Sequence, residues 1–353
     1  MKLKKYLSII LCSVFILFFS FWCFFVPTPD YSESERRALA DFPEISWQKI
    51  WTGNFAKEFE EYTTDRFPIR DKWRSIKAYT RLNLLLQKEN NDIFVKEGHI
   101  SKLEYPMNTK MLDYSISLFS KIEEKHLQQN DVYFAIVPDK NEYLADLKLD
   151  YNELEKYIYD RMQFCTPIHL NQLLSAEDYY FTDSHWRQDK ITDVAQHIAK
   201  AMGTDISADY KKQNLEIPFK GVYAGQSALV YEPDVITYLT NDTIDGLQVT
   251  GAKAVYDMKK ANGKDAYEFF LSGNQPLVKI SNPKNTDGKR LIVFRDSFAS
   301  SLMPLMAEGY SEITMVDLRY MNSLFLEQYV DFLDAQVLFL YSSTILNNST
   351  SMR

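Results

Sequence analysis

Cysteine and histidine are scarce in this chain, and their scarcity excludes several kinds of site. Of the three Cys, Cys12 and Cys23 fall in an apolar N-terminal run, so Cys165 has no partner for an intrachain disulfide in the rest of the chain. Three Cys exclude a Cys-rich zinc site, and no pair among the five His has the spacing of metal ligands. We therefore expect no metal site and no cofactor.

Glycine, proline and net positive charge are also limited. The 11 Gly and 12 Pro form no low-complexity segment, which excludes a disordered chain, and a hydrophobic content of 46% is enough for a substantial core. Acids outnumber bases by 48 to 40, with the two signs interspersed, for a net charge of −8. Because binding to phosphate requires a basic face, we do not expect nucleic acid as a partner.

Charge is absent from Tyr6–Val26, a run long enough to cross about 30 Å of hydrocarbon as a helix. Three Lys precede this run and acidic residues follow it, which places the N-terminus in the cytoplasm and the rest of the chain outside. The alternative is a cleaved signal peptide. The run ends in FWCFFVPTPD (Phe21–Asp30), where bulky residues replace the small ones of a cleavage site, so the sequence favours an uncleaved anchor in the cell membrane.

The chain is expected to have three parts. Residues 1–26 form the Lys cluster and transmembrane signal anchor, residues 27–90 a linker followed by N-terminal helices, and residues 91–353 an α/β domain. The polar segment Pro27–Ser46 is typical of an extended linker, and helical periodicity then runs over Asn54–Leu86 with a break at Pro68.

Apolar runs with strand character alternate with amphipathic helices in the third part. This alternation predicts a mostly parallel sheet covered by helices on both faces. The expected strands are Asp131–Pro138, Arg290–Phe294, Glu312–Leu318 and Ala335–Tyr341. The expected helices are Lys110–Gln128, Leu149–Phe164, Lys190–Gly203, Ala299–Ala307 and Ser323–Leu333. Residues 205–281 are less regular and are expected to form a β-rich insertion with hairpin character.

One of these strands ends in Arg295-Asp296-Ser297, and a helix begins at once. A parallel sheet carries its working groups at the carboxyl ends of its strands. A Ser hydroxyl there can act as a nucleophile, and the first backbone N–H groups of the helix can stabilise an oxyanion. The alternative is that Ser297 only caps the helix.

A Ser nucleophile needs an adjacent base, and the segment FTDSHWRQDK (Phe181–Lys190) supplies a candidate. His185 can take the Ser297 proton, and Asp183 can reach the other ring nitrogen if the loop curls. Asp183 and Ser184 can equally be helix caps, with Trp186 an ordinary core residue. The sequence alone does not decide whether Asp183, His185 and Ser297 meet.

DSHW (Asp183–Trp186), followed far downstream by DSF (Asp296–Phe298), resembles the DHHW protein family. The chain is similar to the SGNH-hydrolase-like domain of the alginate O-acetylation proteins. SESERRALADFPEIS followed by GNFAKEFEEYTTDRFPIRDKW (Gly53–Trp73) is typical of that group, and VPDKNEYL (Val137–Leu144) and VDLRYM (Val316–Met321) fit as further blocks. The resemblance covers nearly the whole chain beyond the anchor.

The resemblance implies a membrane-attached, extracytoplasmic, three-layer α/β/α domain of the SGNH-hydrolase-like type. It implies Ser297 as nucleophile, His185 as base and Asp183 as orienting acid, acting on O-acetyl groups of a cell-surface polysaccharide. It also implies a membrane-bound acyltransferase as the partner that supplies the acetyl group. Transfer and hydrolysis use the same residues, so O-acetyltransferase and acetylesterase both remain open.

Two positions depart from the family pattern. Ser184 stands where the family name has its first His, and Arg295 replaces the Gly usual before Asp-Ser in SGNH hydrolases. No counterpart of the SGNH Asn block is evident, so the second oxyanion donor is unassigned. Candidates for binding substrate are Arg295, Arg319, Tyr341, Lys140 and Trp186. A noncatalytic glycan-binding protein, or a scaffold of the cell envelope, is the alternative function.

Overall fold

The computed structural model describes residues 2–25, 27–206 and 209–353, and these divide into two compact units. The first unit contains the chain up to Asn91 together with Ala224–Val230. The second contains Asp92–Tyr223 and Tyr231–Arg353. The expected α/β domain is therefore interrupted, because a short segment of the expected insertion belongs to the first unit.

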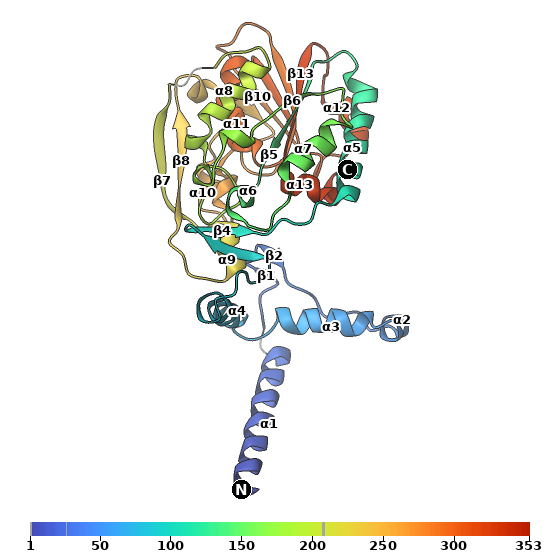
Figure 1. The fold of residues 1–353 in the computed structure, drawn as a ribbon, viewed down its shortest axis with the longest axis vertical. Coiled ribbons are helices and arrows are strands. Elements are labelled where there is room, and N and C mark those ends of the chain that lie inside the picture. The colour runs from blue at the N-terminus through green and yellow to red at the C-terminus, as the bar shows by residue number, and fades with distance from the viewer. Residues whose placement is uncertain (1, 26, 207–208) are drawn as a thin grey trace. The chain divides into compact units, whose positions relative to one another are not determined.

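The second unit is built on a seven-stranded sheet with the order β6-β5-β13-β11-β12-β10-β9 (Figure 1). The first five strands in this order are parallel, and β10 and β9 pair antiparallel. The strands are β5 (Val132–Val137), β6 (Thr166–Ile168), β9 (Gln248–Thr250), β10 (Leu277–Ser281), β11 (Arg290–Arg295), β12 (Glu312–Val316) and β13 (Ala335–Ser342). The mostly parallel sheet is confirmed.

Alternate residues of the central strands enter two separate apolar cores, as the two-residue period of a strand requires. In β13, Leu338 and Leu340 join one core, whereas Val337 and Phe339 join the other. The first core is covered by α8 (Thr192–Ala201) and α11 (Ala299–Met306). The second is covered by α5 (Thr109–Ile122), α7 (Tyr151–Tyr159), α12 (Leu326–Tyr329) and α13 (Ser343–Asn347). Helices on both faces make this an α/β/α fold.

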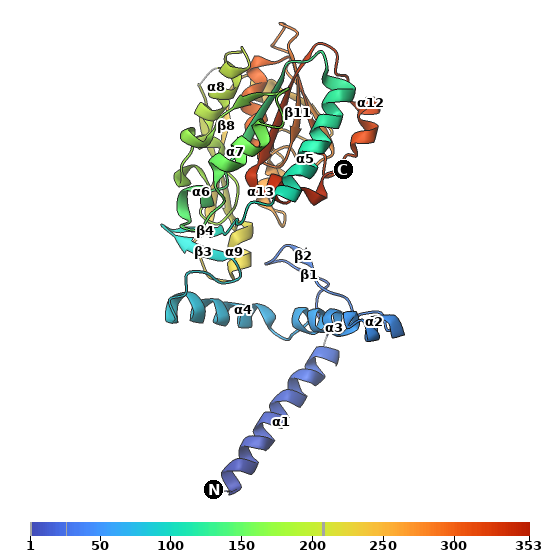
Figure 2. The same cartoon turned by 45° about the vertical axis from the view of Figure 1, so that its right-hand side comes forward.

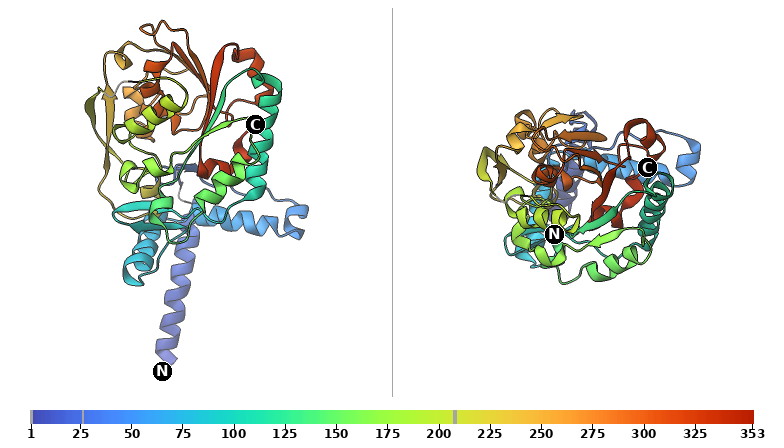
Figure 3. Two further views of the ribbon diagram at one scale, coloured as in Figure 1. Left: turned by 45° about the horizontal axis from the view of Figure 1, so that its top comes forward. Right: turned by 90° about the horizontal axis from the view of Figure 1, so that it is seen from above.

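The expected insertion is only partly separate from the main sheet. Its hairpin forms from β7 (Lys211–Phe219) and β8 (Asp234–Thr240) and runs along one edge of the unit (Figures 1 and 3). However, β9 and β10, which lie in the same expected insertion, extend the central sheet instead. A third apolar core with Phe219, Ile236 and Phe270 fills the space behind the hairpin. A further hairpin, β3 (Ile93–Lys96) with β4 (His99–Lys102), begins the unit.

The first unit contains α1 (Lys2–Phe25), which is long and apolar enough to cross a membrane. Further along the chain come α2 (Trp47–Trp51), α3 (Asn54–Asp65) and α4 (Arg70–Tyr79), and a π-helix, η1 (Thr80–Leu84), continues α4 (Figure 2). The turn between α3 and α4 contains Pro68, where the sequence predicts a break. The expected extended linker is instead partly paired, since β1 (Tyr31–Ser32) and β2 (Arg37–Ala38) form a small antiparallel pair.

Replacing Phe339 by Ala is expected to destabilise the second unit strongly. Phe339 is fully buried, and its ring lies 4.8 Å from that of Phe119, 5.9 Å from that of Phe134 and 4.8 Å from that of Phe294. Loss of these contacts leaves a cavity that costs about 3–5 kcal/mol in the free energy of unfolding. Denaturant titration of the full chain in detergent measures this. Phe325→Ala, at a position 49% exposed, should cost about 0.5 kcal/mol or less.

Candidate active site

Ser297 lies in the turn that joins β11 to α11. The carboxylate of Asp296 shapes this turn: its Oδ1 accepts a hydrogen bond from the N–H of Phe298 (3.0 Å), and its Oδ2 accepts one from the N–H of Ser342 (2.7 Å). Ser342 is the last residue of β13, the strand next to β11. One buried carboxylate therefore both shapes the turn before α11 and ties it to the neighbouring strand end.

The structure brings Asp183, His185 and Ser297 into one hydrogen-bonded line. Ser297 Oγ lies 2.8 Å from His185 Nε2, and His185 Nδ1 lies 2.6 Å from Asp183 Oδ1. Asp183 is only 1% exposed, whereas the His185 side chain is 13% exposed and Ser297 is half-buried. Because a carboxylate accepts only, His185 carries its proton on Nδ1, which leaves Nε2 free to accept the Ser297 proton. This arrangement can activate a Ser for acyl transfer.

Two backbone N–H groups hold the Asp183 carboxylate and so fix the curled shape of its loop. The N–H of Val222 donates to Asp183 Oδ2 at 2.8 Å, and the N–H of His185 donates to Asp183 Oδ1 at 3.1 Å. The loop therefore curls as a two-residue separation of acid and base requires. Gly221, just before Val222, has no room for a side chain, because a Cβ there would lie 2.3 Å from the carbonyl oxygen of Thr182 and 2.4 Å from the Cβ of Asp183.

A Tyr that the sequence did not indicate positions the His185 ring. The ring of Tyr267 stacks on that of His185, with centroids 3.8 Å apart and planes 11° apart. The Tyr267 hydroxyl lies 2.9 Å from Ser301 Oγ, which also accepts the Nε1–H of Trp186 at 2.9 Å. This links the His185 ring to helix α11. Tyr267 lies in the irregular region of the sequence, where no periodic pattern could single it out.

Lys140 supports the loop from inside the protein. Its ammonium donates hydrogen bonds to the carbonyl oxygens of Tyr180 (2.9 Å), Phe181 (3.2 Å) and Asp183 (2.6 Å). Burial lowers the pKa of Lys140 to about 8, although the neighbouring carboxylates, Asp139 foremost, act in the opposite direction. Lys140 is fully buried, so its position argues against the direct contact with substrate that the sequence suggested.

Asp234 holds the same loop from the β8 side. Its carboxylate accepts hydrogen bonds from the N–H of Phe181 (2.9 Å), the N–H of Thr182 (2.8 Å) and the Thr182 hydroxyl (2.6 Å). The Thr182 hydroxyl in turn accepts the N–H of Gly221 at 2.9 Å. The segment before His185 is therefore held by buried polar groups from β8 and from the start of α6 (Asn141–Leu144).

Arg295 also lies inside the protein, beneath the Ser297 turn. Its guanidinium donates to the carbonyl oxygen of Asp296 (3.3 Å) and to Ser300 Oγ (3.2 Å), so it bridges the two sides of Ser297. A third bond reaches the carbonyl oxygen of Gln275 at 3.3 Å. With no exposed surface, Arg295 is placed to support the turn, and its burial argues against the direct contact with substrate that the sequence suggested.

The other three suggested binding residues are also committed to contacts within the protein. Trp186 and Tyr341 have no exposed surface. The Trp186 Nε1–H donates to the carbonyl oxygen of Phe298 at 3.1 Å as well as to Ser301. The Arg319 guanidinium makes two bonds to the carboxylate of Asp317, at 2.9 and 2.6 Å, and its side chain is 14% exposed. Of the five, Arg319 alone keeps some surface.

The start of α11 offers fewer oxyanion donors than its helical geometry suggests. The N–H of Phe298 already donates to Asp296, so it is not available to a substrate. The backbone N–H of Ser297 itself is a candidate donor beside the hydroxyl.

Comparison with known proteins places the fold. No protein-family model matches the sequence, and no curated protein matches it. Among solved structures, a DHHW family protein from Eubacterium siraeum matches with a TM-score of 0.63 and 21% identity over 74% of this chain and 95% of that one. Bacillus cereus PatB1, solved with a sulfonyl adduct, matches with a TM-score of 0.59 and 20% identity over 73% of this chain and 97% of that one. The shared fold agrees with the resemblance carried by the motifs.

We expect Asp139, beside Lys140, to make the stability of the second unit depend on pH. Burial raises the pKa of Asp139 to about 6, while its Oδ1 accepts the N–H of Asn141 at 2.9 Å. A group whose pKa is higher in the folded state stabilises the fold below its unfolded pKa of about 4, and this contribution is lost as the pH rises through about 6.

Asp139→Asn should therefore remove a pH dependence. From pH 4 to pH 7, the free energy of unfolding of the parent should fall by about 2 kcal/mol relative to that of the variant. Denaturant titrations at several pH values measure this difference. The matched control is Asp146→Asn, at a side chain 79% exposed. Parallel pH profiles for parent and Asp139→Asn would contradict the assignment.

Proposed function

We propose that this chain is a membrane-anchored, extracytoplasmic Ser-His-Asp enzyme that transfers or removes O-acetyl groups on a cell-surface polysaccharide. The observation that carries the proposal is the hydrogen-bonded line from Asp183 through His185 to Ser297 Oγ. The order of the three groups, their partial exposure at the Ser297 end and the burial of the acid all suit acyl transfer.

The proposed reaction has two halves. His185 Nε2 takes the proton of Ser297 Oγ as the oxygen attacks the acetyl carbonyl carbon, and the Ser297 N–H stabilises the oxyanion. The tetrahedral intermediate collapses to acetyl-Ser297, and His185 returns the proton to the departing alcohol. An acceptor hydroxyl then attacks the acetyl group, with His185 again acting as base, and Ser297 is released. A glycan hydroxyl as acceptor gives transfer, and water gives hydrolysis.

The proposed location rests on α1. Its apolar length, the three Lys in its first turn and the acids after it support a single span with the second unit outside the cell. If the reaction is transfer, acetyl groups from cytoplasmic metabolism must cross the membrane, and we propose as the donor the membrane-bound acyltransferase that the family resemblance implies.

Ser297→Ala should abolish covalent labelling and turnover. The full chain in detergent is incubated with an activated acetyl ester, or with an aryl sulfonyl fluoride, the latter chosen because PatB1 has been solved with a sulfonyl adduct. Intact mass should show one added acetyl or sulfonyl group on the parent, and acetate release should fall about 10³-fold or more in the variant. Ser311→Ala, at a Ser remote from His185, is the control.

Two results would count against this function. Equal acetate release by the parent and Ser297→Ala would exclude Ser297 as nucleophile. A parent that gains no mass with either reagent, but binds a glycan on an array, would favour the noncatalytic glycan-binding alternative.

Gly221→Ala should lower turnover without removing any of the three reacting side chains. The added methyl group collides with the backbone of Thr182 and with Asp183, so the loop must move and His185 must lose its alignment. We expect kcat to fall about 10²-fold, with KM nearly unchanged. Gly246→Ala is the matched control, because a Cβ there would only reach Lys284 Cε at 3.7 Å. Unchanged kcat in Gly221→Ala would show that the loop tolerates displacement.

A further inference from the structure

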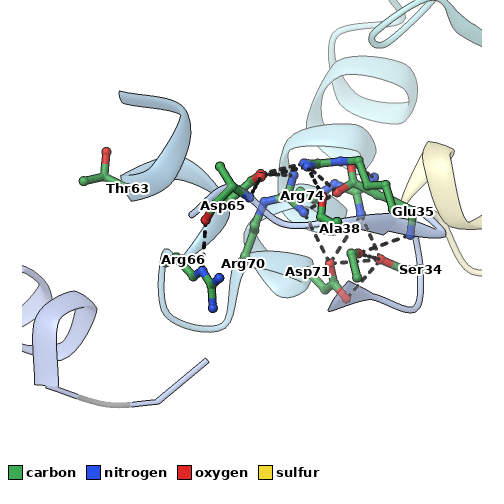
Figure 4. Close-up of polar contacts among 12 residues, drawn as sticks. Ser34, Glu35, Ala38, Thr63, Asp65, Arg66, Arg70, Asp71 and Arg74 are labelled. Carbon is green, nitrogen blue, oxygen red and sulfur yellow. Dashed lines mark hydrogen bonds and ion pairs between the residues drawn. The ribbon is translucent and has the colours of Figure 1, made fainter. Parts of the chain in front are cut away.

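Helix α4 turns its charged side toward the interior of the first unit. Arg70 donates to Glu35 Oε2 at 2.6 Å, and Arg74 donates to Ser34 Oγ at 3.2 Å (Figure 4). Arg74 also donates to the carbonyl oxygens of Gly225 and Gln226, each at 3.1 Å. These two Arg point into the unit and leave their charges paired there, so the protein covers the Arg side of α4, whereas Asp71, Lys72 and Lys77 are exposed.

The partners of these Arg are themselves held in place. Asp65 accepts two hydrogen bonds from Arg37, at 2.7 and 2.5 Å, and one from the N–H of Ala40 at 2.9 Å. The bonds from Arg37 hold the pKa of the Asp65 carboxyl below its usual value. Figure 4 shows Asp65, Arg70 and Arg74 converging on one cluster with Glu35. The cluster therefore fixes the rotation of α4 about its own axis.

The apolar side of α4 consequently faces outward. Ile69, Trp73, Ile76 and Tyr79, spaced three or four residues apart, are 49%, 40%, 56% and 61% exposed. A surface helix in water shows the opposite arrangement, with its apolar stripe buried and its charges outside. An outward apolar face of this size needs a neighbour that is not water.

Exposed apolar side chains continue before and after α4 in the chain. In α2, Trp47 is 78% exposed and Trp51 is 85% exposed. After α4, three consecutive Leu, Leu84 to Leu86, are 70%, 59% and 80% exposed. Trp and Tyr are the side chains enriched where a bilayer meets water. The composition of this surface therefore matches a lipid interface.

Aromatic contacts join α1 to the segment around α4, and so relate this apolar surface to the membrane that α1 could span. The ring of Phe19 stacks on that of Phe67 at 5.2 Å and meets that of Trp73 edge-on at 6.4 Å. Phe19 lies within the apolar stretch Tyr6–Cys23 of α1. If α1 spans a membrane, Phe67 and Trp73 lie against its outer portion, at the depth where hydrocarbon gives way to headgroups.

We propose that α4, with α2 and the segment Leu84–Leu86, lies in the outer interface of the membrane that α1 spans, with its apolar face in the lipid. Lys72 and Lys77 on α4 suit anionic headgroups. The inference rests on the proposed anchor and is independent of the chemistry at Ser297. The first unit would then contact the membrane in two ways: α1 would span it, and α4 would lie flat in its interface.

Quenching of Trp fluorescence by spin-labelled lipid tests this inference. The full chain is placed in nanodiscs of phosphatidylcholine and phosphatidylglycerol, with the label near the headgroup. The emission of each Trp is the difference between the parent and its Trp→Phe variant. Trp73 emission should fall about twofold or more, as expected of a side chain in the interface, whereas emission of Trp186, which is fully buried, should not change.

Trp22 in α1 separates the two proposals. Quenching of Trp22 without quenching of Trp73 would overturn the interfacial position and leave the anchor intact. If neither is quenched and alkaline washing removes the chain from the discs, the anchor itself fails, and the interfacial position fails with it.

A pair of charge substitutions on α4 tests the face. Ile76→Asp places a charge in the proposed lipid side, and quenching of Trp73 should fall about twofold or more. Ser75→Asp adds the same charge to the neighbouring side of the helix and should leave the quenching as in the parent. Equal quenching in the two variants would contradict the proposed orientation.

Discussion

The buried ammonium of Lys140 decides the shape of the loop that carries Asp183 and His185. That loop has no regular secondary structure, so its carbonyl groups need donors from elsewhere in the fold. Lys140 supplies three of the hydrogen bonds, and Asp234 receives the facing N–H groups. Without this pair of buried charges, the loop would lack the bonds that hold Asp183 and His185 in line with Ser297.

The parallel sheet supplies the second half of the arrangement. Adjacent parallel strands end at the same edge, so the turn after β11 and the end of β13 meet there. Asp296 joins them, and Arg295 supports the same turn from below. Both side chains are buried, and both act on the position of Ser297 through the backbone. Arg295, which the sequence suggests for substrate contact, is thus bonded within the protein beside Ser297.

The two units use buried charge in different ways. In the second unit, buried ionic groups order a loop next to a candidate nucleophile. In the first unit, a cluster pairs Arg70 and Arg74 of α4 with Glu35 and Asp65. The apolar side of α4 is left outside. The proposed bilayer contact explains why a short helical segment pairs its charges inward, where burial of an ion pair has a desolvation cost.

Local patterns in the sequence were sufficient for the α/β fold, the apolar N-terminal run, the break at Pro68 and the candidate residues Asp183, His185 and Ser297. Each of these depends on periodicity or on a few neighbouring residues. Tertiary structure alone decided that His185 meets Ser297 across 112 positions, that Tyr267 stacks on His185, and that Arg295 and Lys140 point inward. These contacts join residues far apart in the chain. They form only when folding buries the residues together, and a local sequence pattern does not show which distant residues will meet.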